Sequence, residues 1–134
     1  MENNDTNTDG SIYTKISKRL IGLAGENSAA EFIEQMGLKV IKRNYRCPTG
    51  EMDIIALQGP CLVFIEVRTR TSAVRGWGEE SITAKKRQRL FGIAKYYIKE
   101  SGFKFWPEVR FDLIAIRWPK QEDKPEIEWL KGIF

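Results

Sequence analysis

The stretch that decides the fold is residues 50–70, GEMDIIALQGPCLVFIEVRTR, which reads as two short apolar strands joined by a Gly-Pro turn. Two carboxylates lie in these strands, because Asp53 opens the apolar run IIAL and Glu66 interrupts LVFIEV. A carboxylate at such a position loses water, which is costly unless an opposite charge compensates it. The two acids therefore require either arginine partners or a bound cation.

Strand periodicity predicts which of these side chains share a face. Alternate residues of a strand point to the same face of the sheet. On the second strand one face should therefore carry Leu62, Phe64, Glu66, Arg68 and Arg70. On the first strand the same rule groups Glu51, Asp53, Ile55 and Leu57. If the strands pair as a hairpin, the carboxylates of Asp53 and Glu66 become neighbours at about 5–8 Å, which suits a shared divalent ion.

Length and composition are those of one soluble domain. The chain has 134 residues, of which 42% are hydrophobic and 30% charged. Its apolar runs fall short of the roughly 20 residues of a membrane span, and the start MENNDTNTDG is acidic and polar, unlike a signal peptide. We expect a cytoplasmic protein without a membrane partner, with a disordered acidic tail over residues 1–12 and a single domain over 13–134.

The absence of histidine from the sequence narrows the chemistry. It excludes Ser-His-Asp and Cys-His catalysis and histidine-ligated zinc. Cys47 and Cys61 are too few for a zinc module and are expected as reduced thiols. A hydrolase of this composition would depend on carboxylates, Lys or Arg, water and a bound metal ion.

The distribution of positive charge points toward a polyanion. The net charge is +4, and the segment from Glu66 to Leu90 contains seven basic residues and three acidic ones. A basic cluster can be only a solvated helix face. Because this one adjoins two buried acids, we favour nucleic acid as the partner.

The order of predicted elements gives a mixed sheet with helices packed on it. A first helix is clearest over residues 25–36, with a break allowed near Gly22 and Gly25 and a stop at Gly37. A second helix starts at a cap formed by Ser81 or Thr83 and runs to about residue 100. Strands are expected over about 38–46, 51–57, 61–70, 108–118 and, shorter, from 126, and residues 71–80 are expected as a loop.

Two helical residues could complete the acidic cluster. Glu26 shares a helix face with Ala29, Ala30 and Ile33, and Lys86 lies one turn before the inward stripe of the second helix. The alternatives are that Glu26 only favours the positive end of its helix dipole and that Lys86 extends to solvent. For the remaining acids we favour structural roles: Glu51 in its turn, and Asp112 in an ion pair with Arg110 or a neighbouring strand.

The wider pattern resembles a known family. An acid on one strand, Glu-x-(Lys/Arg) on the next and a preceding helical Glu are similar to the PD-(D/E)xK nuclease superfamily. The segments GLAGENSAAEFIEQMG, IKRNYRCPTGEMDIIA, LVFIEVRTR, SITAKKRQRL, VRFDLIAI and IEWLKGIF, in this spacing, resemble the YraN family of predicted endonucleases. The resemblance covers about residues 20–134.

This resemblance implies a restriction-endonuclease-like α/β fold. Its core would be three-layered, α/β/α, around a mixed central sheet, in the order α-β-β-β-α-β plus a short C-terminal strand. The implied activity is phosphodiester cleavage that depends on Mg²⁺ or Mn²⁺. Glu26, Asp53 and Glu66 match the acidic positions, the carbonyl of Val67 would join the metal ligands, and Lys86 matches the basic position that opens the second long helix.

Arg68 departs from the pattern, because the superfamily usually has Lys there. Arginine, with a pKa above about 12, can orient water and stabilise negative charge but is a poor base. Three alternatives follow: the metal alone activates the water, Lys86 supplies the missing amine, or cleavage has weakened or been lost.

The hypothesis from the sequence is therefore a metal-dependent endonuclease acting on nucleic acid, with DNA favoured. The residues expected to grip phosphates or stack on a base are Arg70, Arg75, Trp77, Lys85, Arg87 and Arg89. No element for reading base edges is visible in the sequence, which favours selectivity for nucleic-acid structure over sequence. Similarity to junction resolvases makes a homodimer reasonable. The rivals are a binding module that does not cut and a structural partner of another DNA-processing protein.

Overall fold

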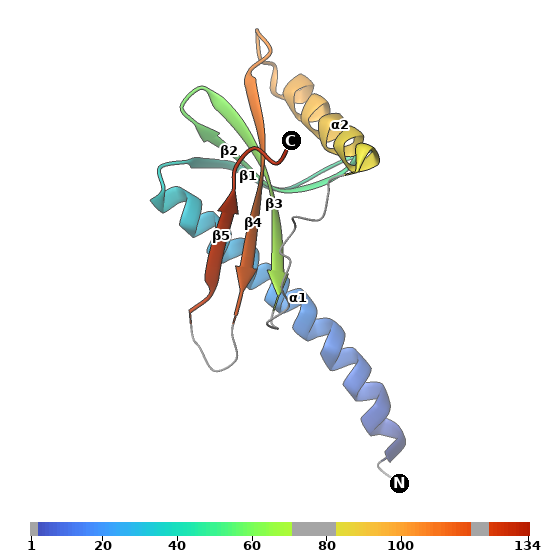
Figure 1. Cartoon of the computed structure of the whole chain (residues 1–134). Coiled ribbons are helices and arrows are strands. Elements are labelled where there is room, and N and C mark those ends of the chain that lie inside the picture. The colour runs from blue at the N-terminus through green and yellow to red at the C-terminus, as the bar shows by residue number, and fades with distance from the viewer. Residues whose placement is uncertain (1–2, 71–82, 119–123) are drawn as a thin grey trace.

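The chain is an α/β protein (Figure 1). The computed structural model describes residues 3–70, 83–118 and 124–134, and side chains from Lys18 onward. The described residues form α1 (Asn3–Gln35), β1 (Lys39–Cys47), β2 (Gly50–Gln58), β3 (Cys61–Arg70), α2 (Ala84–Ser101), β4 (Glu108–Arg117) and β5 (Glu126–Leu130). The predicted order of helices and strands is confirmed.

The strands form one mixed sheet in the order β1-β2-β3-β4-β5. Neighbouring strands are antiparallel except β3 and β4, which run parallel. The connection between these two contains α2, as expected because parallel neighbours need a long crossover. The predicted hairpin of β2 and β3 is confirmed.

Each face of the sheet is covered by one helix. Helix α1 contributes Ala29, Ala30 and Ile33 to an apolar cluster with Ile54, Ala56, Val63, Ile65, Ile114 and Ile116. Helix α2 contributes Leu90, Ile93, Ala94 and Ile98 to another cluster with Tyr45, Met52, Ile55, Leu62, Phe64 and Phe111. The central strands are apolar on both faces because both faces are buried. The predicted inward positions Ala29, Ala30 and Ile33 of α1 are confirmed.

Helix α1 is continuous through Gly22 and Gly25, so the break allowed by the sequence does not occur. A Cβ atom on Gly25 would lie 1.9 Å from Oγ1 of Thr69, so glycine lets α1 approach β3 closely. The helix ends as predicted, since Gly37 has a φ of +96° and its N–H donates to the carbonyl of Glu34.

The start of α1 reaches further than the sequence indicated. The helix begins at Asn3 and so runs through most of the segment predicted as a disordered tail, and its first half extends past the sheet (Figure 1). The division of the chain at residue 13 stays a prediction. Within the described ranges, neither helix is long and apolar enough to cross a membrane.

The alternation of faces along β2 fails at Asp53. Met52 and Ile55 belong to the same cluster on the α2 side, although strict alternation would put them on opposite faces. On the neighbouring strand Asn44 has a φ of +52°. The prediction that Asp53 continues the face of Ile55 and Leu57 is therefore wrong, because both strands change phase at this level of the sheet.

Asp112 forms the predicted structural ion pair. Its side chain is fully buried, and both its oxygens accept hydrogen bonds from the Arg110 guanidinium at 2.8 and 2.9 Å. The indole of Trp129 and the N–H of Gly132 also donate to it, each at 2.9 Å. This carboxylate ties the C-terminal residues to β4. The cysteines Cys47 and Cys61 are free thiols, as predicted.

Candidate functional site

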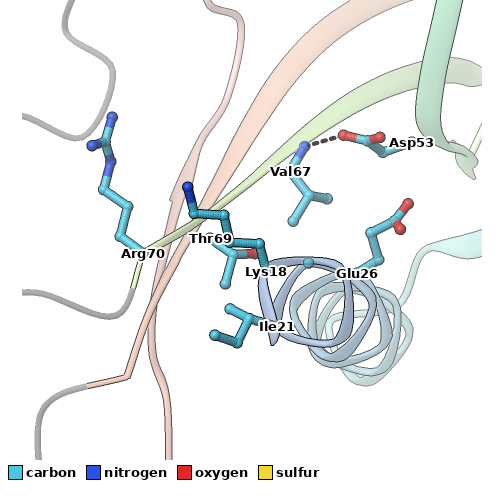
Figure 2. Close-up of a pocket in the computed structure, with 8 residues that line it drawn as sticks. Lys18, Ile21, Glu26, Asp53, Val67, Thr69 and Arg70 are labelled. Atoms are coloured by element: carbon cyan, nitrogen blue, oxygen red, sulfur yellow. Dashed lines mark hydrogen bonds between the residues drawn. The ribbon is translucent and has the colours of Figure 1, made fainter. Parts of the chain in front are cut away.

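A cavity of about 520 Å³ lies between α1 and the end of β3 (Figure 2). Its walls mix apolar, acidic and basic side chains, namely Lys18, Ile21, Gly22, Glu26, Asp53, Val67, Thr69 and Arg70. Figure 2 shows the side chain of Glu26 rising from α1 toward Asp53. The cavity therefore brings together an acid from the first helix, an acid from β2 and the backbone of β3.

Asp53 lies just beyond the last paired residues of β2 and β3, Ile54 and Ile65. Its Oδ2 accepts a hydrogen bond from the N–H of Val67 at 2.8 Å. The pKa of Asp53 nevertheless rises from 3.8 to about 6, first because burial removes water and then because Glu26, Glu66 and Glu51 repel its charge. Burial and the neighbouring acids thus destabilise the charged form of Asp53.

One carboxylate oxygen of Glu26 lacks a partner among the described residues. Its Oε1 is buried and accepts no hydrogen bond from any group within the described parts of the chain. Burial raises the pKa of Glu26, the charge of Arg43 on β1 lowers it, and Glu51 raises it. A buried carboxylate oxygen normally has a donor, so this atom is available to a cation or a water molecule.

Glu26 also borders a second cavity, of about 560 Å³, on the other side of α1. The two cavities share Glu26 and Gly22. The second one adds the cationic side chains of Arg19 and Arg46. Arg46 lies 3.5 Å from Glu51, so Glu51, at the start of β2, has an exposed ion pair. Glu26 therefore lies between two cavities that carry basic groups.

Lys18 and Thr69 are pocket residues that the sequence reasoning missed. Lys18 lies on the helix face that continues through Gly22 to Glu26, at spacings of four residues. Extending the inward stripe of α1 by two turns would have found it. Arg70, which was expected to share the face of Glu66, lines the cavity with Val67 and Thr69 instead. Its Nε is buried and bonds to no acceptor in the described residues.

Glu66 and Arg68 do not line this cavity. Leu62 and Phe64 pack on the α2 side and Val67 on the α1 side, so alternation along β3 directs Glu66 and Arg68 toward the α2 side. Both residues are half-buried. Glu66 is still close enough to Asp53 to raise its pKa. Asp53 and Glu66 thus lie on adjacent strands, and their charges interact, but their side chains point to different sides of the sheet.

The predicted basic residues of α2 lie apart from the cavity. Thr83 is the N-cap, and its hydroxyl accepts from the N–H of Lys86, which confirms one of the two predicted caps. Lys86 is half-buried and is not among the cavity-lining residues. The side chains of Lys85, Arg87 and Arg89 are exposed. The predicted contacts Arg75 and Trp77, like Ser81, lie outside the described residues.

The described acids do not form a preformed metal site with three protein ligands. Among the described residues, no three His, Cys, Asp or Glu side chains come close enough to hold a metal together. Charge acts over longer distances than a coordination bond, which explains why the acids still perturb one another. The arrangement can offer two carboxylates, from Glu26 and Asp53, to a cation that keeps other ligands.

These features define an α/β protein with an acidic pocket against its first helix. Residues 25–116 match the family described as uncharacterised protein family UPF0102, and the chain belongs to that family. The match begins at the glycine that lets α1 approach β3 and includes both pocket acids. Both pocket acids therefore lie in the segment that defines the family, whereas Lys18, Ile21 and Gly22 precede it.

The chain is similar to UPF0102 proteins along nearly its whole length. A relative from Desulfitobacterium hafniense is 57% identical over 117 residues, which are 87% of this chain and 97% of the relative. One from Moorella thermoacetica is 42% identical over 119 residues, 89% of this chain and 98% of the relative. One from Pelotomaculum thermopropionicum is 37% identical over 118 residues, 88% and 98% of the two chains.

Proposed function

We propose that the protein is a cytoplasmic, metal-dependent endonuclease that hydrolyses phosphodiester bonds of nucleic acid, above all DNA. The observation that carries this proposal is the pair of pocket acids. Glu26 has a buried oxygen without a described partner, and the pKa of Asp53 is raised to about 6 by burial and neighbouring acids. Such a cluster of acids lacking enough compensating charge favours a bound cation.

We further propose that the fold is the three-layer, restriction-endonuclease-like one. Support comes from the order of elements, from the mixed sheet and from the packing of α1 and α2 on opposite faces. The resemblance to the YraN family and to the PD-(D/E)xK superfamily adds to this support. A fold by itself does not define a reaction, so the proposal of nuclease activity depends on the pocket.

The residues present fit Mg²⁺ or Mn²⁺. Magnesium needs only one or two carboxylates, since waters and substrate phosphates complete its octahedron. The buried Oε1 of Glu26 and the Oδ1 of Asp53, which is not the oxygen that accepts from Val67, are suitable hard donors. The carbonyl of Val67 would join them, whereas Glu66, which is directed to the other side of the sheet, would favour the ion through the charge that it already exerts on Asp53. When bound, the ion would polarise the scissile phosphate and lower the pKa of water.

The basic residues would act on the phosphate. Arg68 would stabilise charge in the transition state rather than remove a proton, because its guanidinium stays protonated. Lys86 and Arg68 lie outside the cavity, so they would act on a substrate phosphate that reaches the α2 side of the sheet, with Lys86 as the amine that Arg68 cannot replace. Lys18 and Arg70, which line the cavity with the acids, would orient the nucleic-acid backbone.

The wider interface would involve Lys85, Arg87 and Arg89 on α2, together with Arg75 and Trp77. Contacts of this type reach phosphates and unpaired bases, so selectivity for branches, flaps or single strands is expected rather than selectivity for sequence. A homodimer would let two such sites act on the two strands of a branched substrate.

A second candidate is a nucleic-acid-binding module that does not cut. It is favoured by the Arg at position 68, which cannot serve as a general base, and by the lack of a three-acid ion cage in the described part of the chain. This candidate predicts affinity that falls with salt and no metal-dependent product.

Cleavage assays separate the two candidates. Branched, flapped, single-stranded and duplex DNA are incubated with the protein and Mg²⁺ or Mn²⁺, beside Asp53→Asn and Glu26→Gln. Glu34→Gln is a matched control, because Glu34 lies exposed on the same helix, two turns beyond Glu26. We expect products with the wild type and the control, and a loss of at least about 100-fold in both pocket variants.

Binding of the ion is measured by calorimetry, with and without DNA. Saturable binding that both pocket variants lose would support the metal site independently of any choice of substrate. The nuclease proposal is rejected if folded wild type binds no ion even on DNA, or if cleavage persists in EDTA or in Asp53→Asn. Salt-dependent DNA binding without products would then favour the binding module.

A further inference from the structure

A group of exposed aromatic side chains lies on α2 and on the segment that follows it. Phe91, Tyr96, Phe103 and Trp106 are all exposed, Trp106 by 60%. Large aromatic side chains gathered on a surface mark a binding site more often than chance. None of these residues lines the acidic pocket.

A small cavity lies within this group. Its volume is about 190 Å³, and its walls include Phe91, Lys95, Trp106, Arg110, Phe111 and Phe134. This is smaller than the roughly 300 Å³ at which sites for drug-sized ligands begin, so it suits one planar ring rather than a whole metabolite. A second hollow of about 220 Å³ shares Lys95 and adds Tyr96 and Lys99.

The floor of the cavity is a stack of aromatic rings. Phe64 and Phe111 stack with centroids 5.5 Å apart, and Phe111 and Phe134 stack at 4.8 Å. Phe91 meets Phe111 edge to face at 5.4 Å. Phe134 is held here because the C-terminal backbone bonds to β4, through Gly132 to Asp112 and Ile133 to Phe111. The ring platform is therefore fixed before any ligand arrives.

Basic groups border the same surface. Helix α2 carries six basic residues and one acidic residue, Glu100, whose carboxylate accepts a bond from the hydroxyl of Tyr45. Lys95, Lys99 and Lys104 are exposed beside the aromatic side chains. A second copy of this chain would bring the same excess of positive charge to the contact, which opposes self-association. The surface is complementary to a ligand with planar rings and negative charge.

We propose that this surface binds single-stranded nucleic acid, with one unpaired base in the 190 Å³ cavity against Trp106 and Phe91, and phosphates on Lys95 and Lys99. Aromatic platforms combined with lysines are how proteins hold unpaired strands without reading their sequence. The inference rests on the proposed function, since it assigns an additional substrate contact to the same protein.

The basic face of α2 connects this surface with the strand that carries Asp53. Arg89 precedes Lys95 by six residues, between one and two helical turns, and its Cγ and Cδ lie 3.5 Å from the position of a Cβ on Gly50, at the start of β2. A strand that follows α2 would thus run from the cavity toward β2. The site predicts a preference for substrates with a single-stranded arm.

The test is fluorescence anisotropy with a labelled ten-nucleotide oligothymidylate and with a duplex of equal length, in EDTA so that nothing is cleaved. Trp106→Ala should weaken single-strand binding by about 5-fold to about 150-fold, with a smaller effect on the duplex. Lys95→Ala should reduce the slope of log affinity against log salt by about 0.7, the loss of one phosphate contact on a single strand. Phe105→Ala is the matched control, because Phe105 is more exposed and does not line the cavity.

The inference is overturned if Trp106→Ala binds the single strand like wild type, or if Phe105→Ala weakens binding equally. It is also overturned if sedimentation velocity shows a wild-type dimer that Trp106→Ala converts to monomer, since the surface would then be a contact between copies. If wild type binds no nucleic acid at all, the proposed function fails together with this site. Unchanged binding by Trp106→Ala alone rejects only this site.

Discussion

Replacing Asp53 by Asn should stabilise the folded protein at pH 7.5 when divalent ions are absent. Burial, followed by repulsion from Glu26, Glu66 and Glu51, raises the pKa of Asp53 from 3.8 to about 6. A change of this size corresponds to about 3 kcal/mol against the charged form. Asparagine is neutral, and its oxygen can still accept the N–H of Val67. We therefore expect a gain of about 2–3 kcal/mol, or roughly 6–10 °C in Tm for a chain of this length.

The gain should depend on pH in a defined direction. Folded Asp53 holds its proton more tightly than unfolded Asp53, so between pH 3.8 and about 6 the native state binds more protons. The contribution of Asp53 to the free energy of unfolding of the wild type therefore falls as the pH rises through that window. The difference between Asp53→Asn and wild type should be small below pH 4, grow to about pH 6 and stay constant above it.

Urea titrations in EDTA at several pH values measure this difference, with Asp112→Asn as the matched control. Asp112 is fully buried and accepts from Arg110, Trp129 and Gly132, so its amide variant should lose about 3–5 kcal/mol. Adding Mn²⁺ should then stabilise wild type but not Asp53→Asn. If Asp53→Asn is destabilised like the control, Asp53 is a structural acid and the reasoning from its raised pKa is wrong.

Three further predictions concern packing and capping, each measured by urea unfolding. Gly25→Ala should cost about 1–3 kcal/mol despite the better helix propensity of alanine, because its Cβ would meet the Thr69 hydroxyl, and Thr69→Ala should reduce that cost in the double variant; additive costs would contradict the clash. Ile93→Ala should cost about 2–5 kcal/mol, since Ile93 is a fully buried residue of α2, and a loss below about 1 kcal/mol would mean that this helix packs loosely. Thr83→Ala should cost about 1 kcal/mol, since it removes the acceptor for the N–H of Lys86, whereas Thr83→Ser should cost little.

Much of the fold could be predicted from local sequence. Periodicity placed both helices and all five strands among the described residues, because burial on one helix stripe or on two sheet faces leaves a repeating apolar pattern. Gly37 marked the end of α1, and Thr83 the start of α2, for stereochemical reasons that act within a few residues. The ion pair of Arg110 and Asp112 could be predicted for a similar local reason, since residues two apart in a strand share a face.

The site was predicted less completely. Asp53 and Glu26 were identified from their positions in apolar patterns, and both line the cavity. The sequence did not predict that Asp53 and Glu66 point to different faces of the sheet. The face of Asp53 depends on the change of phase that β2 shares with Asn44 on β1. Lys18 was missed because the stripe of α1 was followed only from Glu26 onward.

The sequence by itself determined the elements, the two buried acids and a chemistry without histidine, because these follow from residue type and from spacing along the chain. Only the tertiary structure decided which groups meet. The approach of α1 to β3 at Gly25 aligns Glu26 with Asp53, and the docking of the C-terminal residues on β4 brings Phe134 to Phe111. Such contacts join residues far apart in the chain, and their geometry depends on the packing of whole elements, which no local pattern encodes.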